Sequence, residues 1–190
     1  MKLVLPKFLI KLTGNIYLSS NPFWISYKPT HHKVKGYEIR EILKNIEIGD
    51  ILLRRYDGYL NTYFTPGFWG HAALYVGLDK IIHAIGEGVV QEDILDFCRC
   101  DSVCVLRPDV NNELKNNAIE KAIIMKTDHI QYDYKFKSDD DTQVYCTELV
   151  DSCYKRLFKN DYTIIAGNSV LIPDSIYKSK ECNLIIEFKH

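Results

Sequence analysis

The sequence lacks an excess of charge of either sign. It has 24 lysines and arginines against 25 aspartates and glutamates, which gives a formal net charge of −1 at pH 7. A protein that binds nucleic acid or an anionic surface mainly through electrostatics carries a surplus of basic residues. The balance of charge therefore gives no support for nucleic-acid binding.

Long hydrophobic runs are also missing. The apolar N-terminal stretch, residues 3–12, is interrupted by Pro6, Lys7 and Lys11, and it ends well before the length of about 20 residues that spans a bilayer. No clear small-residue cleavage site follows it, which disfavours a secretory signal. We expect an amphipathic segment that packs on the domain or makes peripheral contact with a membrane surface.

The cysteines lack the spacing of a disulfide scaffold or of a zinc site. They are Cys98, Cys100, Cys104, Cys146, Cys153 and Cys182. The C-x-C-x₃-C run that begins at Cys98 has neither a two-residue knuckle nor a nearby fourth ligand. Free thiols favour a reducing compartment, so we expect a cytoplasmic protein with no metal and no organic cofactor, while secretion stays open.

The residues that are present predict a single α+β domain over residues 1–190, with residues 1–36 as an N-terminal extension, because 190 residues suit one core. Apolar periodicity predicts helices over residues 37–46 and 113–129, and a further helix that begins near residue 145. β-Branched and aromatic runs predict strands over residues 51–54, 70–77, 80–85, 103–107 and 183–188, and a short strand or helix over residues 89–97. Residues 13–36, 56–69 and 167–173 are expected to be loops because they are rich in turn-forming residues.

The helix that begins near Tyr145 carries a cysteine in its first turn. From Cys146 onward, apolar or small residues recur at the i, i+3, i+4 and i+7 positions of a helix that docks on a core. A thiol at a helix N-terminus lies near unpaired backbone N–H groups, which stabilise the thiolate and lower the pKa. Cys146 is therefore either a nucleophile or a small buried core residue, since free cysteine is often buried.

Two histidines lie on what reads as a tight β-hairpin. His71 begins the first strand, Leu78–Asp79 forms the turn, and His83 lies in the second strand. Antiparallel pairing across this turn makes the two histidines neighbours, provided that the register places them on one face. A nucleophilic cysteine needs a base and a group that orients the base, and Cys146, His71 and His83 supply these three parts.

Six segments of the chain resemble, in sequence and in order, the permuted NlpC-like papain-fold cysteine hydrolases, in particular their YiiX/YebB-like branch. The segments are IGDILL at 48–53, PGFWGHAALYVG at 66–77, AIGEGV at 84–89, YDYKF at 132–136, YCTELV at 145–150 and PDS at 173–175. The resemblance implies a circularly permuted papain-like fold, in which an antiparallel sheet or small barrel packs against the cysteine-bearing helix.

The same resemblance implies roles for four residues. Cys146 would be the nucleophile and His71 the general base. The third polar position falls on His83, where many relatives have an acidic residue, and nearby Glu87 is the competing orienting group. The implied reaction is acyl transfer through a thioester, with the backbone N–H of Cys146 as one oxyanion donor and a second donor that the sequence does not identify.

Three functions are compatible with these residues. The first is a cysteine amidase or peptidase that acts on cell-wall peptides, as the resemblance implies. The second is a lipid-directed acyltransferase or phospholipase, because the lecithin:retinol acyltransferase-like relatives also have two histidines on successive strands ahead of a helix-borne cysteine. The third is a binding module without turnover. The partner is then a small peptide or a lipid acyl substrate, and the sequence leaves the oligomeric state open.

Overall fold

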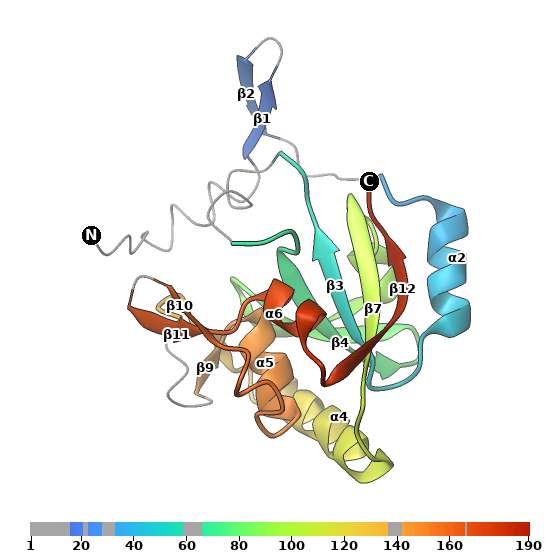
Figure 1. The fold of residues 1–190 in the computed structure, drawn as a ribbon, viewed down its shortest axis with the longest axis vertical. Helices are drawn as coiled ribbons and strands as arrows, with labels where there is room; N and C mark the ends of the chain where they lie inside the picture. Colours follow the sequence, from blue (N-terminus) through green and yellow to red (C-terminus); the bar gives the residue numbers. More distant parts are fainter. Residues whose placement is uncertain (1–15, 21–22, 28–32, 59–65, 137–141, 166) are drawn as a thin grey trace.

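A single six-stranded antiparallel sheet forms the centre of the molecule (Figure 1). The computed structural model describes residues 16–20, 23–27, 33–58, 66–136, 142–165 and 167–190. The strands of the sheet are β3 (Ile51–Arg55), β4 (His71–Gly77), β5 (Lys80–Ile85), β6 (Gly88–Asp93), β7 (Ser102–Pro108) and β12 (Cys182–Phe188). Their order across the sheet is β12-β7-β3-β4-β5-β6, with β12 and β6 at the two edges.

The order of the strands follows from short connections. Strands β3 to β6 form a meander in which each strand pairs with the next. The short helix α3 (Ile94–Phe97) follows β6, and β7 then pairs with β3 on the other side of the meander. The last strand, β12, adds to β7. Strands β3 and β12 are therefore joined through β7, and strands β4 and β5 lie inside the sheet.

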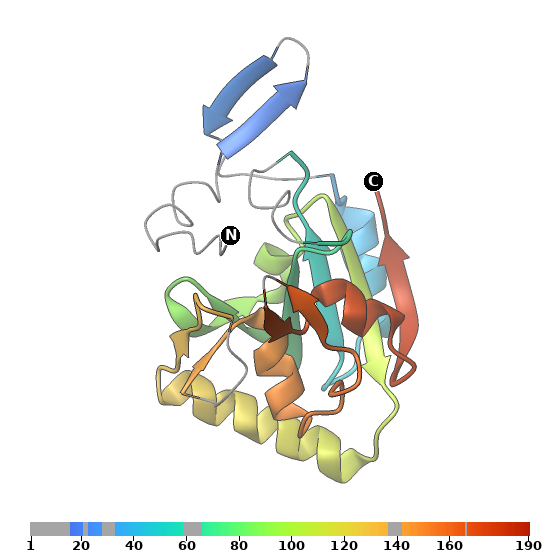
Figure 2. The same ribbon diagram turned by 60° about the vertical axis from the view of Figure 1, so that its left-hand side comes forward.

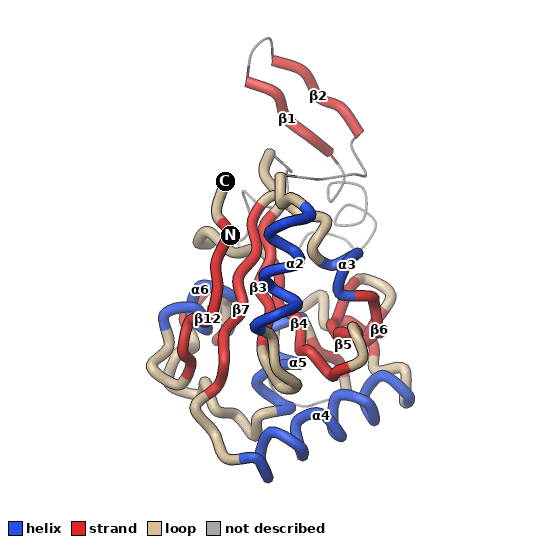
Figure 3. The backbone as a smooth tube through the Cα atoms, turned by 90° about the vertical axis from the view of Figure 1, so that its right-hand side faces the viewer, coloured by secondary structure: helices blue, strands red, loops and turns tan. Residues whose placement is uncertain are grey.

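Both faces of the sheet are covered, and each face has its own core. Along β3, Ile51 and Leu53 belong to one cluster of buried side chains, and Leu52 belongs to the other, because successive side chains of a strand point to opposite faces. Helices α2 (Gly36–Asn45) and α3 contribute to one cluster. Helices α4 (Asn112–Thr127), α5 (Cys146–Cys153) and α6 (Pro173–Lys178) contribute to the other. Figure 3 shows α2 and α3 in front of the sheet, with α5 behind it.

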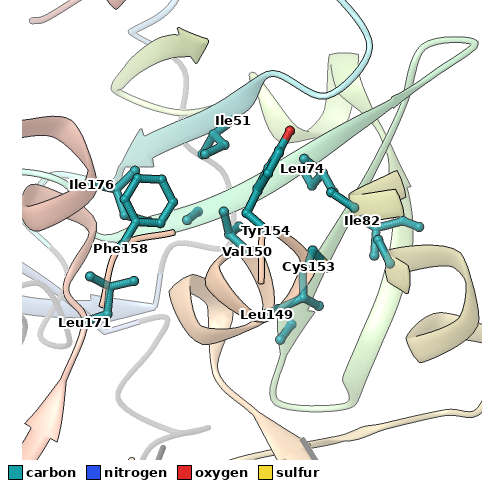
Figure 4. Close-up of a cluster of buried hydrophobic side chains, with 14 of the residues drawn as sticks. Ile51, Leu74, Ile82, Leu149, Val150, Cys153, Tyr154, Phe158, Leu171 and Ile176 are labelled. Carbon is teal, nitrogen blue, oxygen red and sulfur yellow. The ribbon is translucent and has the colours of Figure 1, made fainter. Parts of the chain in front are cut away.

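Helix α5 is buried on all sides, and not only along the predicted stripe. All eight of its residues are buried, including Glu148 and Asp151. Its apolar residues Leu149 and Val150 lie among side chains of β4 and β5 in the core cluster (Figure 4). A helix enclosed in this way has little freedom to shift, which fixes the position of its first residue relative to the sheet.

Three further strand pairs lie outside the main sheet. They are β1 (Ile16–Ser20) with β2 (Phe23–Tyr27), β8 (Gln131–Tyr132) with β9 (Gln143–Val144), and β10 (Thr163–Ile165) with β11 (Asn168–Val170). The β1–β2 hairpin is visible at the top of Figure 2. The prediction of loops over residues 13–36 and 167–173 is wrong for β1, β2 and β11. Their residues pair across short connections despite the turn-forming residues nearby.

Most of the predicted elements are confirmed. The helix predicted over residues 37–46 is α2, and the segment left as strand or helix contains both, since β6 is followed by α3. The predicted helix over residues 113–129 is α4, which ends at Thr127, so that His129 lies beyond it with a φ of 53°. The aromatic loop at 56–69 lies partly outside the described residues. Within the described ranges, no helix is both long and apolar enough to cross a membrane.

An ion pair joins the start of β3 to β7. Arg107 donates to both carboxylate oxygens of Asp50, from Nε at 2.9 Å and from Nη2 at 2.8 Å. Asp50 is fully buried, and it also accepts a hydrogen bond from the backbone N–H of Glu47. A buried carboxylate that loses its cation is costly, so this pair holds the turn before β3 in place.

We expect Arg107→Met to lower the free energy of unfolding by about 2 kcal/mol, which is less than a fully buried pair would give because the Arg107 side chain is 24% exposed. Lys44→Met is the control, since Lys44 and Glu41 form an exposed pair whose loss costs at most about 0.5 kcal/mol. Urea unfolding measures both variants. Equal effects of the two substitutions would show that the Asp50 pair has no special role in stability.

Candidate active site

The β4–β5 hairpin opens toward its histidines. Its turn has two residues, Leu78 and Asp79, with φ values of 52° and 55°, as the tight hairpin prediction requires. Pairing runs from Gly77↔Lys80 to Leu74↔Ile82, with an irregularity between Tyr75 and Gly77. The segment of β4 that precedes Leu74 pairs with β3 but continues beyond the paired part of β5. The backbone N–H and C=O groups along this edge of the segment are therefore available to bond with another element.

His71 and His83 contact each other on this open part of the hairpin. His71 Nε2 and His83 Nδ1 are 3.0 Å apart, and the ring centroids are 5.1 Å apart at an interplanar angle of 71°. The prediction that the two histidines are neighbours is confirmed. Phe97 of α3 lies against both rings, with centroids 6.1 Å from His71 and 5.9 Å from His83. The aromatic ring restricts how either imidazole can rotate.

Two hydrogen bonds to one residue fix the start of α5. Tyr145 is the N-cap, and its hydroxyl accepts the backbone N–H of Leu171 at 3.0 Å. Thr147 Oγ1 donates to the carbonyl of Leu171 at 2.6 Å. The residues on either side of Cys146 are thus bound to the same residue, Leu171, which gives the tyrosine and the threonine that flank the cysteine in the YCTELV segment a structural role.

The Cys146 thiol lies against the open edge of β4. It accepts a backbone hydrogen bond from Ala72, the residue after His71, and further ones from Thr147 and from its own N–H. These donors lower the pKa of the thiol, and so does the charge of Arg54. Burial has the larger effect and raises the pKa above its usual value. The expectation of a lowered thiol pKa is therefore wrong for this enclosed site, because desolvation outweighs the helix N-terminus.

Both histidines are neutral in this environment. Burial lowers the pKa of His71 well below its usual value of 6.5, and the charges of Arg54 and His83 act in the same direction. Burial, followed by Arg54, lowers the pKa of His83 to about 3. The resting site therefore pairs a neutral thiol with neutral imidazoles, and it can accept a proton at neutral pH.

Two charged residues of the site were not found from the sequence. Arg54 of β3 lies directly opposite His71 in the sheet, and Glu92 of β6 lies behind His83. The Arg54 guanidinium stacks 4.3 Å from the centre of the Phe97 ring, and its Nη1 is 3.5 Å from Glu92 Oε2. A basic residue at the end of an otherwise apolar strand was the available signal for Arg54, but Glu92 has no such signal.

Two of the motif segments contact each other and hold the chain that enters β4. Asp174 Oδ2, in the first turn of α6, accepts the backbone N–H of Trp69 at 2.7 Å. Gly67 has a φ of 101°, and a Cβ at this position would lie 2.3 Å from the Asp174 carboxyl group. Only glycine fits so close to Asp174. The PGFWGH and PDS segments therefore act together to place His71.

Tyr132 of β8 completes the surroundings of the thiol. Burial raises the pKa of Tyr132 well above its usual value of 10.0, and the charge of Cys146 is the next cause. The hydroxyl therefore stays protonated next to the cysteine and can donate a hydrogen bond. Tyr132 is held against Tyr134 and Phe136, with ring centroids at 5.0 and 6.5 Å.

Glu87 lies away from the enclosed part of the site. It is exposed in the turn between β5 and β6, whereas His83 is buried and contacts His71. Among the described residues, no group of three or more His, Cys, Asp or Glu side chains could hold a metal ion. The three cysteines of the C-x-C-x₃-C run are separately buried in the sheet and its flanking turn.

Comparisons with known proteins identify the family and the fold. A family model described as a permuted papain-like amidase enzyme of the YaeF/YiiX type, the C92 family, matches residues 45–185. Metalloprotein yiiX from Escherichia coli O157:H7 has a similar structure, with a TM-score of 0.63 and 15% sequence identity over 77% of this chain and 99% of that chain. No curated protein matches the chain.

The chain belongs to the permuted papain-like amidase family. The resemblance to the YiiX-like branch is confirmed, and so is the α+β fold with an antiparallel sheet against the cysteine-bearing helix. At the level of the family, the chemistry is that of a cysteine-type amidase.

We expect iodoacetamide to modify Cys146 before the other cysteines. Cys98, Cys100, Cys104 and Cys153 are at most 1% exposed, against 8% for Cys146, whose thiol also accepts backbone hydrogen bonds. Cys182 is the internal control, because it is more exposed but burial raises the pKa of its thiol to about 12. Peptide mapping after timed alkylation at pH 7.5 measures the order. Equal rates at all six cysteines would contradict an activated thiol at position 146.

Proposed function

We propose that this protein is a cysteine hydrolase that cleaves an amide bond through a thioester intermediate on Cys146. The observation that carries the proposal is the position of the thiol. It lies at the N-terminus of α5 and accepts the backbone N–H of Ala72, the residue that follows His71 in β4, while His71 contacts His83. This arrangement supports Cys146 as nucleophile, His71 as base and His83 as orienting group, the three parts that covalent catalysis requires.

The reaction begins with proton transfer. His71 accepts the thiol proton as the sulfur attacks the carbonyl carbon of the substrate, and a C–S bond forms. The C–N bond then breaks, and the His71 imidazolium gives its proton to the leaving amine. In the second half, His71 takes a proton from water, the hydroxide attacks the thioester, and the carboxylic acid leaves as the thiol is restored. His83 holds His71 in place throughout, and its contact with the base favours it over Glu87 in this role.

Two donors would stabilise the oxyanion. The first is the backbone N–H of Cys146, which the helix start directs toward the thiol. The second is the Tyr132 hydroxyl, which stays protonated beside the cysteine. Removing one such donor from a hydrolase typically lowers kcat by about 100- to 1,000-fold.

The solved relative described as metalloprotein yiiX raises the question of a metal in this chain. In the described part of the chain the donor set does not fit one, since no three His, Cys, Asp or Glu side chains converge. His71 and His83 contact each other through ring nitrogens and leave no shared ligand geometry. The steps above are therefore assigned to the side chains alone.

A lipid ester is the second candidate substrate. The observation that favours it is the third polar residue: a histidine, His83, contacts the base here, where many members of the branch have an acidic residue. A pair of histidines with a cysteine is the set found in lecithin:retinol acyltransferase-like relatives. The same thioester chemistry would then release a fatty acid or transfer it to a second nucleophile.

Substitution of the three central residues tests the chemistry. We expect Cys146→Ala and His71→Gln each to lower kcat by at least about 1,000-fold, because each removes a reacting group. Tyr132→Phe should lower kcat by about 100-fold and leave KM nearly unchanged, because the lost hydrogen bond forms in the transition state. His129→Gln, an exposed histidine outside the site, is the control. Normal turnover by Cys146→Ala would rule out the proposed nucleophile.

The substrate class is tested with two assays on the same preparation. Murein peptides report amide cleavage through released amine, and phospholipid vesicles report ester cleavage through released fatty acid. We expect amine release, and we expect Cys146→Ala to abolish it. Fatty-acid release without amine release would assign the lipid-directed function, and no turnover in either assay would favour a binding module.

The pH profile of kcat/KM should be flat between about pH 6.5 and 9. His71 must be neutral to act as base, and its lowered pKa places the acidic limb below 6.5. Cys146 must retain its proton to supply the leaving group, and its raised pKa places the basic limb above 9.0. A thiolate–imidazolium pair would instead give an acidic limb set by a lowered cysteine pKa and a basic limb set by a raised histidine pKa, as measured over pH 4–10.

A further inference from the structure

The contact between the two histidines has two possible proton arrangements. A neutral imidazole carries a proton on one nitrogen only. If His71 Nε2 donates to His83 Nδ1, then His71 Nδ1 is bare and can accept the proton of Cys146. If His83 Nδ1 donates to His71 Nε2, then His71 carries its proton on Nδ1 and cannot act as a base. The 3.0 Å contact alone is compatible with both.

Glu92 distinguishes the two arrangements. It lies on β6, two residues beyond Val90, which pairs directly with His83, and therefore on the same face of the sheet. Glu92 Oε2 is 3.6 Å from His83 Nε2. Both atoms are buried, and His83 Nε2 has no hydrogen-bond partner within 3.5 Å in the part of the chain that the structure describes. Glu92 Oε2 faces two donors, His83 Nε2 and Arg54 Nη1, the latter at 3.5 Å.

Arg54 keeps Glu92 in its acceptor form. Burial raises the pKa of Glu92, and the charge and hydrogen bond of Arg54 oppose that rise. Arg54 itself is held in place, because it stacks on Phe97, contacts Tyr56 at 5.0 Å and donates to the Phe97 carbonyl at 3.4 Å. A carboxylate accepts hydrogen bonds but cannot donate one. The nitrogen that faces it, His83 Nε2, must then carry the proton.

We propose that Glu92 is a positioning residue that fixes the tautomers of both histidines. It holds the proton of His83 on Nε2, which leaves His83 Nδ1 as the acceptor for His71 Nε2–H and leaves His71 Nδ1 bare for the thiol. Arg54, His71, His83 and Glu92 come from the four consecutive strands β3, β4, β5 and β6, and the contacts run from Arg54 to Glu92, from Glu92 to His83 and from His83 to His71. The proposal deepens the proposed function, because it rests on His71 as the base.

Glu92 also balances the charge that develops in the reaction. Arg54 disfavours a positive charge on either imidazole, and it contributes to the lowered pKa of both. When His71 becomes an imidazolium, the Glu92 carboxylate offsets the Arg54 guanidinium through His83. Loss of Glu92 therefore weakens the base in two ways, through the wrong tautomer and through an unbalanced cation, and both lower kcat without changing the substrate contacts.

Kinetics of two variants test the proposal. We expect Glu92→Leu to lower kcat by about 100-fold, with KM within about twofold of the parent value, by analogy with second groups that orient a catalytic histidine. Glu92→Gln keeps an acceptor but loses the charge, so we expect about a 10-fold loss. Gln91→Leu is the matched control, because Gln91 is the exposed neighbour on the same strand. Parent-like kcat for Glu92→Leu would overturn the proposal.

A spectroscopic test reads the tautomers directly. In ¹⁵N-histidine-labelled Cys146→Ala protein, protonated and bare ring nitrogens have different chemical shifts. We expect bare nitrogens at His71 Nδ1 and His83 Nδ1, with protons on both Nε2 atoms. Adding Glu92→Leu should redistribute these protons, whereas Gln91→Leu should not. An unchanged pattern in a folded Glu92→Leu protein would overturn the assignment, and Glu92→Gln gives the same test if the leucine variant does not fold.

The alkylation rate of Cys146 separates this proposal from the proposed function. Iodoacetamide needs no natural substrate, and its reaction with Cys146 at pH 7.5 depends on His71 accepting the proton. We expect Glu92→Leu to slow the alkylation of Cys146 about 10-fold or more and to leave Cys182 unaffected. If no amide or ester is turned over but this slowing and the tautomer change are observed, the substrate assignment fails and the role of Glu92 stands. If turnover is observed without them, the reverse holds.

Discussion

The hydrogen bond between the Ala72 N–H and the Cys146 thiol is the point at which the two halves of the site meet. The thiol belongs to a helix that packs on one face of the sheet, and the histidines project from the strands of the sheet itself. The bond forms because pairing of β4 with β5 ends at Leu74↔Ile82, so that the edge of β4 is available to the helix.

The surrounding structure serves to hold this junction still. Tyr145 and Thr147 bind the backbone N–H and the carbonyl of Leu171 and fix the first turn of α5. Asp174 binds the backbone of Trp69 just ahead of His71, and Gly67 allows that close approach. The enclosure has an electrostatic consequence, since desolvation keeps both the thiol and the imidazoles uncharged at rest. In the proposed reaction the thiol and the imidazole therefore start as a neutral pair, and charge appears only as the reaction proceeds.

The second layer of the site is built from the meander. Arg54, His71, His83 and Glu92 come from four neighbouring strands and lie on one face, where Phe97 covers them. His83 contacts His71, and the Glu92 carboxylate lies behind His83, one residue further from His71. The charge of Glu92 then acts through an imidazole, and Arg54 sets how strongly it acts. In the proposed function, this layer supports His71 as the base.

The sequence by itself determined most of the local structure and the family, and it predicted the candidate reacting groups. The helical period around Cys146, the two-residue turn at Leu78–Asp79 and the order of the motifs were enough to predict the hairpin, the cysteine helix and the family, because these depend on neighbours along the chain. It failed at β1, β2 and β11, where pairing overrides turn-forming residues. It also gave the wrong direction for the thiol pKa.

Only the tertiary structure decided the direction of the Cys146 pKa shift, the point at which the β4–β5 pairing ends, and the positions of Glu92 and Arg54 behind His83. Desolvation depends on how completely other elements enclose a group, which no pattern along the chain records. The contact of Glu92 with His83 is a diagonal one across two strands, and that of Arg54 with Glu92 joins strands that are not neighbours in the sheet order. Such contacts follow from register and twist, and these are fixed by the packing of the whole sheet.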